Sequence, residues 1–242
     1  MSNKVLIISD NLTQIQNFVE LVSHPKYEQF AFDYAYSHNN KALDALYKEE
    51  NWIKAINVKD AVDDLIRNYQ LILSLHCKQL FPDKLVDNVR CINIHPGLNP
   101  HNRGWFPQVF SIINGKPCGV TIHEIDSELD HGPIICQKEV PIHSWDTSFT
   151  VYNRVLEEEI KLLDSHLLDI IKANYTTHVP EEGNLNLKKD FNKLCEINLE
   201  DVDTFQNHIN RLRALNHGEY NNAFFIDGDG NKVYLKLELI KG

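Results

Sequence analysis

The sequence lacks the cysteine patterns of secreted or zinc-stabilised proteins. Its five cysteines are widely dispersed and odd in number, and no two of them form a C-x-x-C pair. Dispersed, unpaired cysteines are typical of reduced thiols in a cytoplasm rather than of a disulfide framework. We therefore expect a cytoplasmic protein with no bound metal. The cysteines are Cys77, Cys91, Cys118, Cys136 and Cys195.

Long apolar runs and positive charge are also scarce. No stretch approaches the roughly 20 apolar residues that a membrane-spanning helix needs. The apolar N-terminal segment is interrupted by Asp10 and has no small-residue cleavage site, so we interpret it as a strand rather than a signal peptide. With 24 basic and 34 acidic side chains the net charge is −10. Because nonspecific nucleic-acid binding needs clustered Lys and Arg, we expect neither a nucleic-acid nor a membrane partner.

What the sequence does contain is an alternation of strand and helix patterns. This alternation predicts an α/β fold with a mostly parallel sheet. The predicted strands are Lys4–Asp10, Phe30–Ser37, Ala55–Val58, Leu71–His76, Cys91–His95, Cys118–Ile125 and Pro133–Pro141. The predicted helices are Thr13–Val22, Lys41–Glu49, Ala61–Asn68, Pro107–Asn114 and the long amphipathic Thr147–Ala173.

The composition changes after Tyr175, where a polar linker spans 180–186. Beyond it, Asp203–Leu215 has a helical pattern, and Ala223–Ile240 resembles a hairpin around the turn sequence Asp-Gly-Asp-Gly-Asn. We predict a catalytic domain over residues 1–178 and a small C-terminal region over 179–242, with a helix and a β-hairpin.

Polar side chains gather where two predicted strands meet loops. Asn93 and His95 end an apolar run that stops at Pro96, and alternation places them on one face of a strand. In open α/β sheets, ligands bind at the carboxyl ends of the strands. Asp130 follows in a loop just before another apolar run. An amide, an imidazole and a carboxylate at two strand ends indicate an acyl-transfer site.

Four motifs carry a family resemblance: N-x-H-P at residue 93, a downstream R-G, N-G-x-x-x-G-V-T-I-H, and L-D-x-G-x-I. Together they resemble the folate-dependent formyltransferase family. The resemblance implies a Rossmann-like formyltransferase fold, 10-formyltetrahydrofolate as formyl donor, and catalysis by Asn93, His95 and Asp130. One departure is Gly97, where relatives often have Ser.

The expected reaction is attack of a neutral amine on the formyl carbon, which creates an oxyanion. Asn93 and His95 suit hydrogen-bond donation to that oxyanion, and His95 also suits a general base. Asp130 would orient His95; the sequence leaves open whether His95 acts as base or as oxyanion donor. The resemblance further implies that one loop binds the pterin ring, although an ordinary acidic turn is the alternative there. Its residues are Asp126, Ser127, Glu128, Leu129 and Asp130.

Three branches of the family differ in the amine that they formylate. Glycinamide-ribonucleotide enzymes carry a glycine-rich phosphate loop after the first strand, where this chain has Asp10 without those glycines. Methionyl-tRNA enzymes append a larger basic domain, whereas residues 181–242 here hold 8 basic and 11 acidic side chains, a net of −3. The remaining branch formylates nucleotide-linked amino sugars.

The segment from Asn210 to Phe225 resembles a block that holds the nucleotide in sugar formyltransferases, although both prolines and the glycine of that block are replaced. Guanidinium groups can pair with a diphosphate, and aromatic faces can stack on a pyrimidine. Salt bridges, core packing or a solvated surface are the structural alternatives for these residues. The nucleotide-sugar candidates are Lys78, Arg103, Trp105, Arg213, Tyr220 and Phe224.

The resemblance therefore implies an enzyme that formylates the 4-amino group of a nucleotide-linked 4-amino-4,6-dideoxyhexose, as in dTDP-4-amino-4,6-dideoxyglucose of O-antigen synthesis. The alternatives are a formyltetrahydrofolate hydrolase and a non-catalytic folate- or nucleotide-binding protein. We also expect a homodimer through the C-terminal hairpin, because alternation gives one hairpin face a row of leucines that needs a partner. These are Leu235, Leu237 and Leu239.

Overall fold

A computed structural model describes residues 4–242, and the chain divides into two compact units. Unit 1 holds the described residues up to 95 together with 121–137 and 159–180. Unit 2 holds 96–120, 138–158 and 181–242. Both units thus combine segments that are separated in sequence. The predicted boundary at residue 178 concerns domains that are contiguous in sequence, and it stays a prediction.

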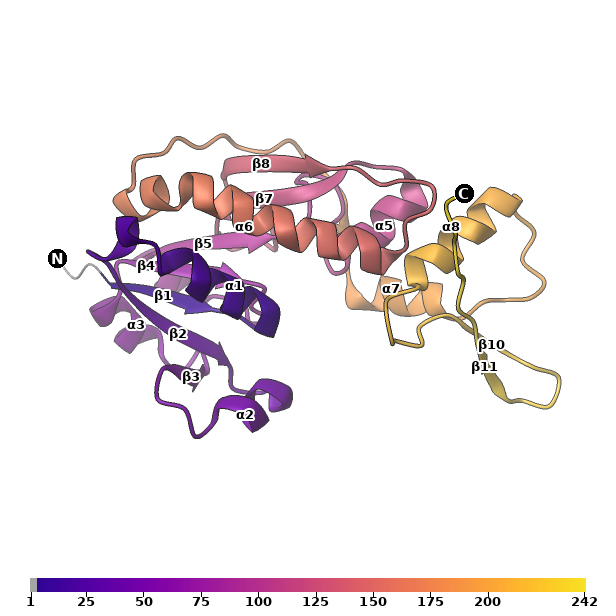
Figure 1. Ribbon diagram of the computed structural model, residues 1–242, viewed down its shortest axis with the longest axis horizontal. Helices are drawn as coiled ribbons and strands as arrows, with labels where there is room; N and C mark the ends of the chain where they lie inside the picture. The colour runs from indigo at the N-terminus through magenta and orange to yellow at the C-terminus, as the bar shows by residue number, and fades with distance from the viewer. Residues whose placement is uncertain (1–3) are drawn as a thin grey trace. The chain divides into compact units, whose positions relative to one another are not determined.

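Seven strands form one sheet in the order β3-β2-β1-β4-β5-β7-β8 (Figure 1). The strands from β3 to β5 pair in parallel, and β7 pairs antiparallel with β5. The predicted α/β fold with a mostly parallel sheet is confirmed. The strands are β1 Lys4–Ile8, β2 Ala31–Ser37, β3 Ile53–Ile56, β4 Leu71–Leu75, β5 Arg90–His95, β7 Cys118–Glu124 and β8 Ile134–Val140.

Helices cover both faces of the unit 1 sheet. Adjacent residues of β2 point to opposite faces, so Ala35 joins the core under α3 and α4, while Tyr36 joins the core under α1 and α2. Figure 1 shows α1 and α6 on the same side of the sheet. Their bounds are α1 Leu12–Val22, η1 Pro25–Tyr27, α2 Lys41–Tyr47, α3 Val62–Asn68, α4 Asp83–Val86 and α6 Ser148–Lys172.

A buried polar group ties α1, β4 and α6 together. Glu159 of α6 is fully buried, and its carboxylate lies 2.9 Å from Nε2 of His76, just after β4. Gln14 of α1 donates to the same carboxylate through Nε2. A buried carboxylate is tolerated only when such partners replace its hydration.

Replacing His76 by leucine should therefore lower the free energy of unfolding by about 3–5 kcal/mol, because it removes one of the two polar partners of a buried carboxylate. Urea unfolding followed by circular dichroism measures this change. The matched control is Asp164→Asn, on the same helix as Glu159. The exposed ion pair of Asp164 with Lys26 should contribute less than about 1 kcal/mol to the free energy of unfolding. A His76→Leu loss no larger than that of the control would contradict the role assigned to the pair.

Unit 2 is organised around the buried side chain of Asn102. Its Nδ2 donates to Ser111 and Asn114, and its Oδ1 accepts from Asn114, Asn184 and Asn186. The short strand pair β6–β9, which the sequence pattern did not predict, forms beside it. The elements of unit 2 outside the large sheet are β6 Arg103–Gly104, α5 Pro107–Asn114, β9 Leu185–Asn186, α7 Lys188–Cys195, α8 Phe205–Leu215, β10 Phe224–Ile226 and β11 Lys232–Tyr234.

The C-terminal hairpin exists but is shorter than predicted. Only three residue pairs join β10 and β11, from Phe224↔Tyr234 to Ile226↔Lys232. Within the predicted hairpin Ala223–Ile240, the second strand ends at Tyr234. The Leu235 N–H still bonds to the Ala223 carbonyl, but further along the Leu237 carbonyl accepts from the Asn216 side chain instead. Alternating burial nevertheless continues, since Leu235, Leu237 and Leu239 are all half-buried.

Candidate active site

The predicted catalytic side chains meet at the carboxyl end of β5. Asn93 and His95 lie two residues apart on this strand and share a face. Antiparallel pairing with β7 places His123 directly opposite Asn93, and Thr121 directly opposite His95. His95, Thr121 and His123 are buried, whereas Asn93 is half-buried. The strand end thus presents one amide and two imidazoles on a single surface.

Asp130 completes this group from the loop between β7 and β8. Its Oδ1 accepts a 2.9 Å hydrogen bond from Nδ2 of Asn93, and its Oδ2 lies 3.4 Å from Nδ1 of His95. Asp130 is 8% exposed and adopts the left-handed conformation, with φ of 50°. Non-glycine residues in this conformation are uncommon and gather at functional sites. The structure therefore brings Asn93, His95 and Asp130 together, although their catalytic roles stay predictions.

The electrostatics of this group favour proton transfer at His95. A carboxylate accepts but cannot donate, so the neutral His95 ring is best accommodated with its proton on Nδ1, facing Asp130. This tautomer leaves Nε2 able to accept a proton, and the adjacent carboxylate would stabilise the resulting imidazolium. Such an arrangement suits general base catalysis at neutral pH.

The loop predicted to bind the pterin is shaped by its own contacts. The Asp126 carboxylate accepts from the Glu128 backbone N–H and lies 2.9 Å from Nδ1 of His131. Gly132 lies so close to the Glu124 carbonyl that an added Cβ would approach its oxygen to 1.9 Å. This contact explains the glycine of the L-D-x-G motif. Ser127 and Glu128 are exposed, so their polar groups are accessible to a ligand.

Asp10 occupies the position where a phosphate loop would lie. Its carboxylate accepts from the backbone and hydroxyl of Ser37, from Nδ2 of Asn40 and from the backbone N–H of Lys78. It therefore links the loops that follow β1, β2 and β4. A carboxylate with these partners leaves no room for the amide cradle that a phosphate needs at this helix end. The sequence indicated the missing glycines but not this structural role.

Two nucleotide-sugar candidates are basic residues with unused hydrogen-bonding capacity. Lys78 of unit 1 is exposed, and its ammonium forms no ion pair within the part of the chain that the structure describes. Arg103 of unit 2 is only 8% exposed, and its buried Nε has no hydrogen-bond partner among residues 4–242. Trp105, two residues further on, is half-buried beneath the Lys188 ammonium, which lies 5.5 Å from the ring centroid.

Arg213 has a different environment from the one that its predicted role suggests. It is 7% exposed, its Nε donates to Asn210, and its Nη1 donates to the backbone carbonyls of His143 and Asp146. Burial lowers the pKa of this guanidinium from its ordinary value. These contacts give Arg213 a structural function within unit 2, and its contact with a nucleotide stays a prediction.

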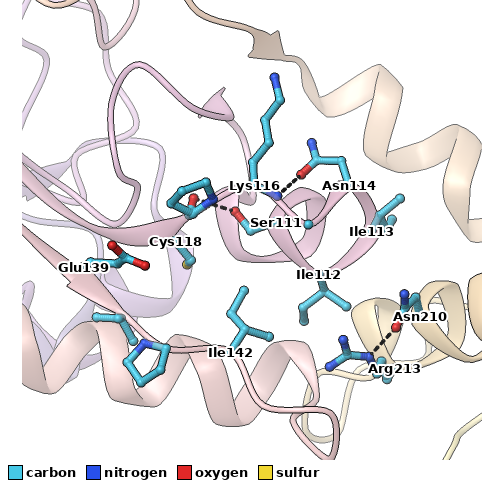
Figure 2. Close-up of a pocket in the computed structure, with 14 residues that line it drawn as sticks. Ser111, Ile112, Ile113, Asn114, Lys116, Cys118, Glu139, Ile142, Asn210 and Arg213 are labelled. Carbon is cyan, nitrogen blue, oxygen red and sulfur yellow. Dashed lines mark hydrogen bonds between the residues drawn. The ribbon is translucent and has the colours of Figure 1, made fainter.

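A cavity of about 520 Å³ lies beside Arg213 within unit 2. Figure 2 shows Asn210 and Arg213 on one side of it, Glu139 on the other and the α5 residues Ser111 and Ile112 between them. All of its lining residues belong to unit 2. The Arg213 side chain thus borders this cavity and also donates hydrogen bonds to the backbone carbonyls of His143 and Asp146.

The aromatic candidates divide between surface and core. Tyr220 is 69% exposed and belongs to a ring cluster centred on His217, with Phe149 and Tyr152 at 5.5 and 5.4 Å from the imidazole. Burial lowers the pKa of His217, which keeps the ring neutral near pH 7. Phe224, by contrast, packs on the small C-terminal core. Tyr220 is thus accessible to a planar ligand, and Phe224 is mainly a packing residue.

Residues 4–242 contain no cluster of three or more His, Cys, Asp or Glu side chains that could hold a metal ion. Within the same residues, no helix has the length and apolarity needed to cross a membrane.

The doubly wound sheet, with an amide, an imidazole and a carboxylate joined at a strand end, defines an acyl-transfer enzyme. Residues 5–167 match the family model described as formyl transferase, and residues 190–241 match one described as the N-formyltransferase dimerization C-terminal domain. The chain belongs to the formyl transferase family. Its predicted place in the sugar N-formyltransferase branch is confirmed by the relatives below.

One relative is the dTDP-4-amino-4,6-dideoxyglucose formyltransferase of Mycobacterium tuberculosis, 53% identical over 76% of this chain and 79% of its own. A solved 4-N formyltransferase from Francisella tularensis is 45% identical, covers 98% of both chains and has a TM-score of 0.94. The formyltransferase of Anoxybacillus kamchatkensis is 25% identical over 78% of this chain and 88% of its own, with a TM-score of 0.60. That structure is described as a complex with UDP-4,6-dideoxy-4-formamido-L-AltNAc and tetrahydrofolate.

Proposed function

We propose that this chain transfers a formyl group from 10-formyltetrahydrofolate to the 4-amino group of dTDP-4-amino-4,6-dideoxyglucose, in the synthesis of O-antigen sugars. The observation that carries the proposal is the contact of Asp130 with both Asn93 and His95 at the end of β5. The mycobacterial relative, named for this substrate, supports the choice of sugar. The Francisella structure, named a 4-N formyltransferase, supports the position of the amine.

The residues at the end of β5 have distinct parts in this reaction. Nε2 of His95 takes the proton that the amine loses as it bonds to the formyl carbon, and Asp130 stabilises the imidazolium. The protonated ring can then return the proton to the folate nitrogen that leaves. Because His95 and Asp130 are almost fully buried, their interaction is only weakly screened by water.

The loop from Asp126 to Asp130 is the candidate binding segment for the formyl donor. Exposed loop backbone offers donors and acceptors for the edge of a pterin, and the Asp126 side chain shapes the turn by accepting from the Glu128 N–H. The Anoxybacillus structure, described with tetrahydrofolate bound, supports a folate co-substrate for this fold. We infer that the loop binds the pterin mainly through its backbone, and that Asp130 has both a binding and a catalytic role.

The nucleotide part of the substrate has candidate partners in unit 2. Arg103 has a buried guanidinium with hydrogen-bonding capacity to spare, which suits a diphosphate. The exposed ring of Tyr220, held beside His217, suits stacking on a pyrimidine. Trp105, two residues after Arg103, is the candidate for the sugar. Lys78, in unit 1, stays a diphosphate candidate from the sequence alone.

A direct assay with the dTDP-amino sugar and 10-formyltetrahydrofolate tests the function. Formation of the 4-formamido sugar is the expected result, and the matching UDP-sugar and 3-amino isomers serve as controls for the substrate. Formate released without any amine would instead indicate a hydrolase. Binding of both ligands by calorimetry without turnover would indicate a non-catalytic binding protein, and either result would overturn the proposal.

Residues 190–241 match a dimerization domain, and we propose that the hairpin within it forms the two-fold contact. Ile226 and Tyr234 of the hairpin are 44% and 49% exposed, so the strand pair presents apolar surface that a second copy could cover. Light scattering should give about twice the mass of one chain.

Truncation after Asn222 should give monomer or aggregate, because it removes both hairpin strands. A sharper variant is Tyr234→Glu, which places charge at the contact and should yield monomer without loss of helix content. Val179→Glu is the control, since Val179 is 78% exposed but lies outside the matched domain. If Tyr234→Glu stays dimeric like the control, another surface of the C-terminal region forms the dimer.

A further inference from the structure

His123 faces the catalytic group without belonging to the predicted set. It lies opposite Asn93 in the β5–β7 pairing and is 2% exposed. Its Nε2 is 3.3 Å from Nδ2 of Asn93 and 3.7 Å from Oδ1 of Asp130. Its other ring nitrogen, Nδ1, is 2.7 Å from the backbone oxygen of Glu124. Both nitrogens of this ring therefore have a defined partner.

The Glu124 carbonyl fixes the tautomer of His123. A carbonyl oxygen can only accept, so Nδ1 must carry the proton that this short contact requires. In the neutral ring Nε2 is then unprotonated and can only accept. Asn93 is the nearest group that can donate to it.

The tautomer in turn fixes the Asn93 amide. Both groups next to that side chain, Nε2 of His123 and Oδ1 of Asp130, are acceptors. Only the nitrogen of the amide can satisfy them, because its oxygen would meet two electron-rich atoms. The two hydrogens of Nδ2 are thus assigned, one to each neighbour. No described residue donates to Oδ1 of Asn93, which is half-buried rather than enclosed.

We propose that His123 is a positioning residue for formyl transfer. It holds the Asn93 amide with its nitrogen toward His123 and Asp130, so that Oδ1 of Asn93 can accept a hydrogen bond from an N–H of the attacking amine. The inference rests on the proposed function and refines the site at the end of β5. With both Nδ2 hydrogens in use, Asn93 does not serve as the oxyanion donor that the sequence suggested. Its oxygen instead turns the lone pair of the amine toward the formyl carbon.

The reaction balances with this assignment. The bond from the amine nitrogen to the formyl carbon forms, and the bond from that carbon to the folate nitrogen breaks. One proton passes from the amine to the folate nitrogen by way of His95. The N–H that Asn93 accepts stays on the product amide, so neither Asn93 nor His123 gains or loses a proton over the cycle.

Two substitutions separate the hydrogen bonds of His123. In His123→Gln the side-chain oxygen can reach the position of Nε2 and still accept from Asn93, but the bond to Glu124 is lost. In His123→Asn the amide nitrogen can take the position of Nδ1 and donate to Glu124, but nothing accepts from Asn93. We expect His123→Asn to lower kcat about 10- to 100-fold, by analogy with the loss of hydrogen bonds that orient metal-ligating side chains, with little change in KM for the sugar. His123→Gln should keep most of the activity.

A double-substitution cycle shows whether the effect acts through Asn93. Added to Asn93→Ala, His123→Asn should lower kcat by less than twofold, because the amide that it orients is gone. An equal fold-loss in both backgrounds would show a general structural role and overturn the proposal. The opposite order of the two single variants, with Gln less active than Asn, would overturn it too.

The tautomer can be measured without catalysis. Nitrogen-15 NMR of histidine-labelled protein distinguishes a protonated from an unprotonated ring nitrogen, and the resonances lost in His123→Gln assign this residue. Protonated Nδ1 with bare Nε2 near neutral pH is the expected state. A protonated Nε2, which would instead pair with Asp130, overturns the inference even if the enzyme is active. Absence of formyl transfer by the unaltered protein would overturn the proposed function instead, and the NMR result would still decide the tautomer.

Discussion

Replacement of His95 by asparagine should lower turnover by about 10²–10⁴, the range found when a general acid–base group is removed. Asparagine keeps a polar side chain but cannot take the proton that the amine loses. Binding of the dTDP-amino sugar should change little, because the ring is buried beside Asp130 rather than exposed to the nucleotide. Steady-state kinetics gives the loss in kcat, and calorimetry gives the affinity for the sugar.

The matched control for this variant is His178→Asn, which changes an exposed histidine of the same unit. It should leave kcat and stability nearly unchanged. A His95 variant that keeps a near-normal rate would refute His95 as the group that transfers the proton. A loss in sugar affinity as large as the loss in kcat would assign His95 to binding instead.

The second large effect is expected at Asp130. Asp130→Ala removes the acceptor for the Asn93 amide and the carboxylate beside His95 in one step, so we expect kcat to fall by about 10²–10⁴. The sugar should again bind nearly as before. Since Asp130 also belongs to the predicted pterin loop, affinity for the folate should fall as well, which separates this variant from His95→Asn.

The isosteric variant Asp130→Asn refines the test. The new amide can still accept from Asn93 through its oxygen, but it presents an N–H to Nδ1 of His95 and thereby disfavours the Nδ1–H tautomer. We expect a loss close to that of Asp130→Ala despite the preserved shape. If Asp130→Asn retains most of the activity, the negative charge and the tautomer are unimportant, and Asp130 serves mainly to shape the loop.

Short-range patterns determined much of the fold. Alternating strands and amphipathic helices predicted the α/β class, helix α5 at Pro107–Asn114 and, to within a residue at each end, helix α6 at Ser148–Lys172. These features are readable because an apolar period of about 2 or 3.6 residues is a local property of the chain. The same reasoning ended the strand of Asn93 and His95 at Pro96, next to the loops that a substrate must reach.

Elements with weak local sequence signals were missed or were predicted with the wrong length. Helix α7 at Lys188–Cys195 is short and polar, and strands β6 and β9 contain two residues each. The second hairpin strand was predicted too long, since its alternation of apolar and charged residues continues beyond the last paired residue, Tyr234. Alternation of apolar and polar residues indicates which side of a segment is buried, but backbone hydrogen bonding to a neighbouring strand decides where the strand ends.

The sequence by itself determined the family, the sheet and the three residues that are predicted to carry the chemistry. Only the tertiary structure decided which polar groups satisfy one another across long separations, such as Glu159 with Gln14 and His76, or His123 with Asn93. The physical reason is that a hydrogen bond depends on distance and direction to within a few tenths of an ångström. Periodicity places a side chain on a face, but the pairing of β5 with β7 selects its partner.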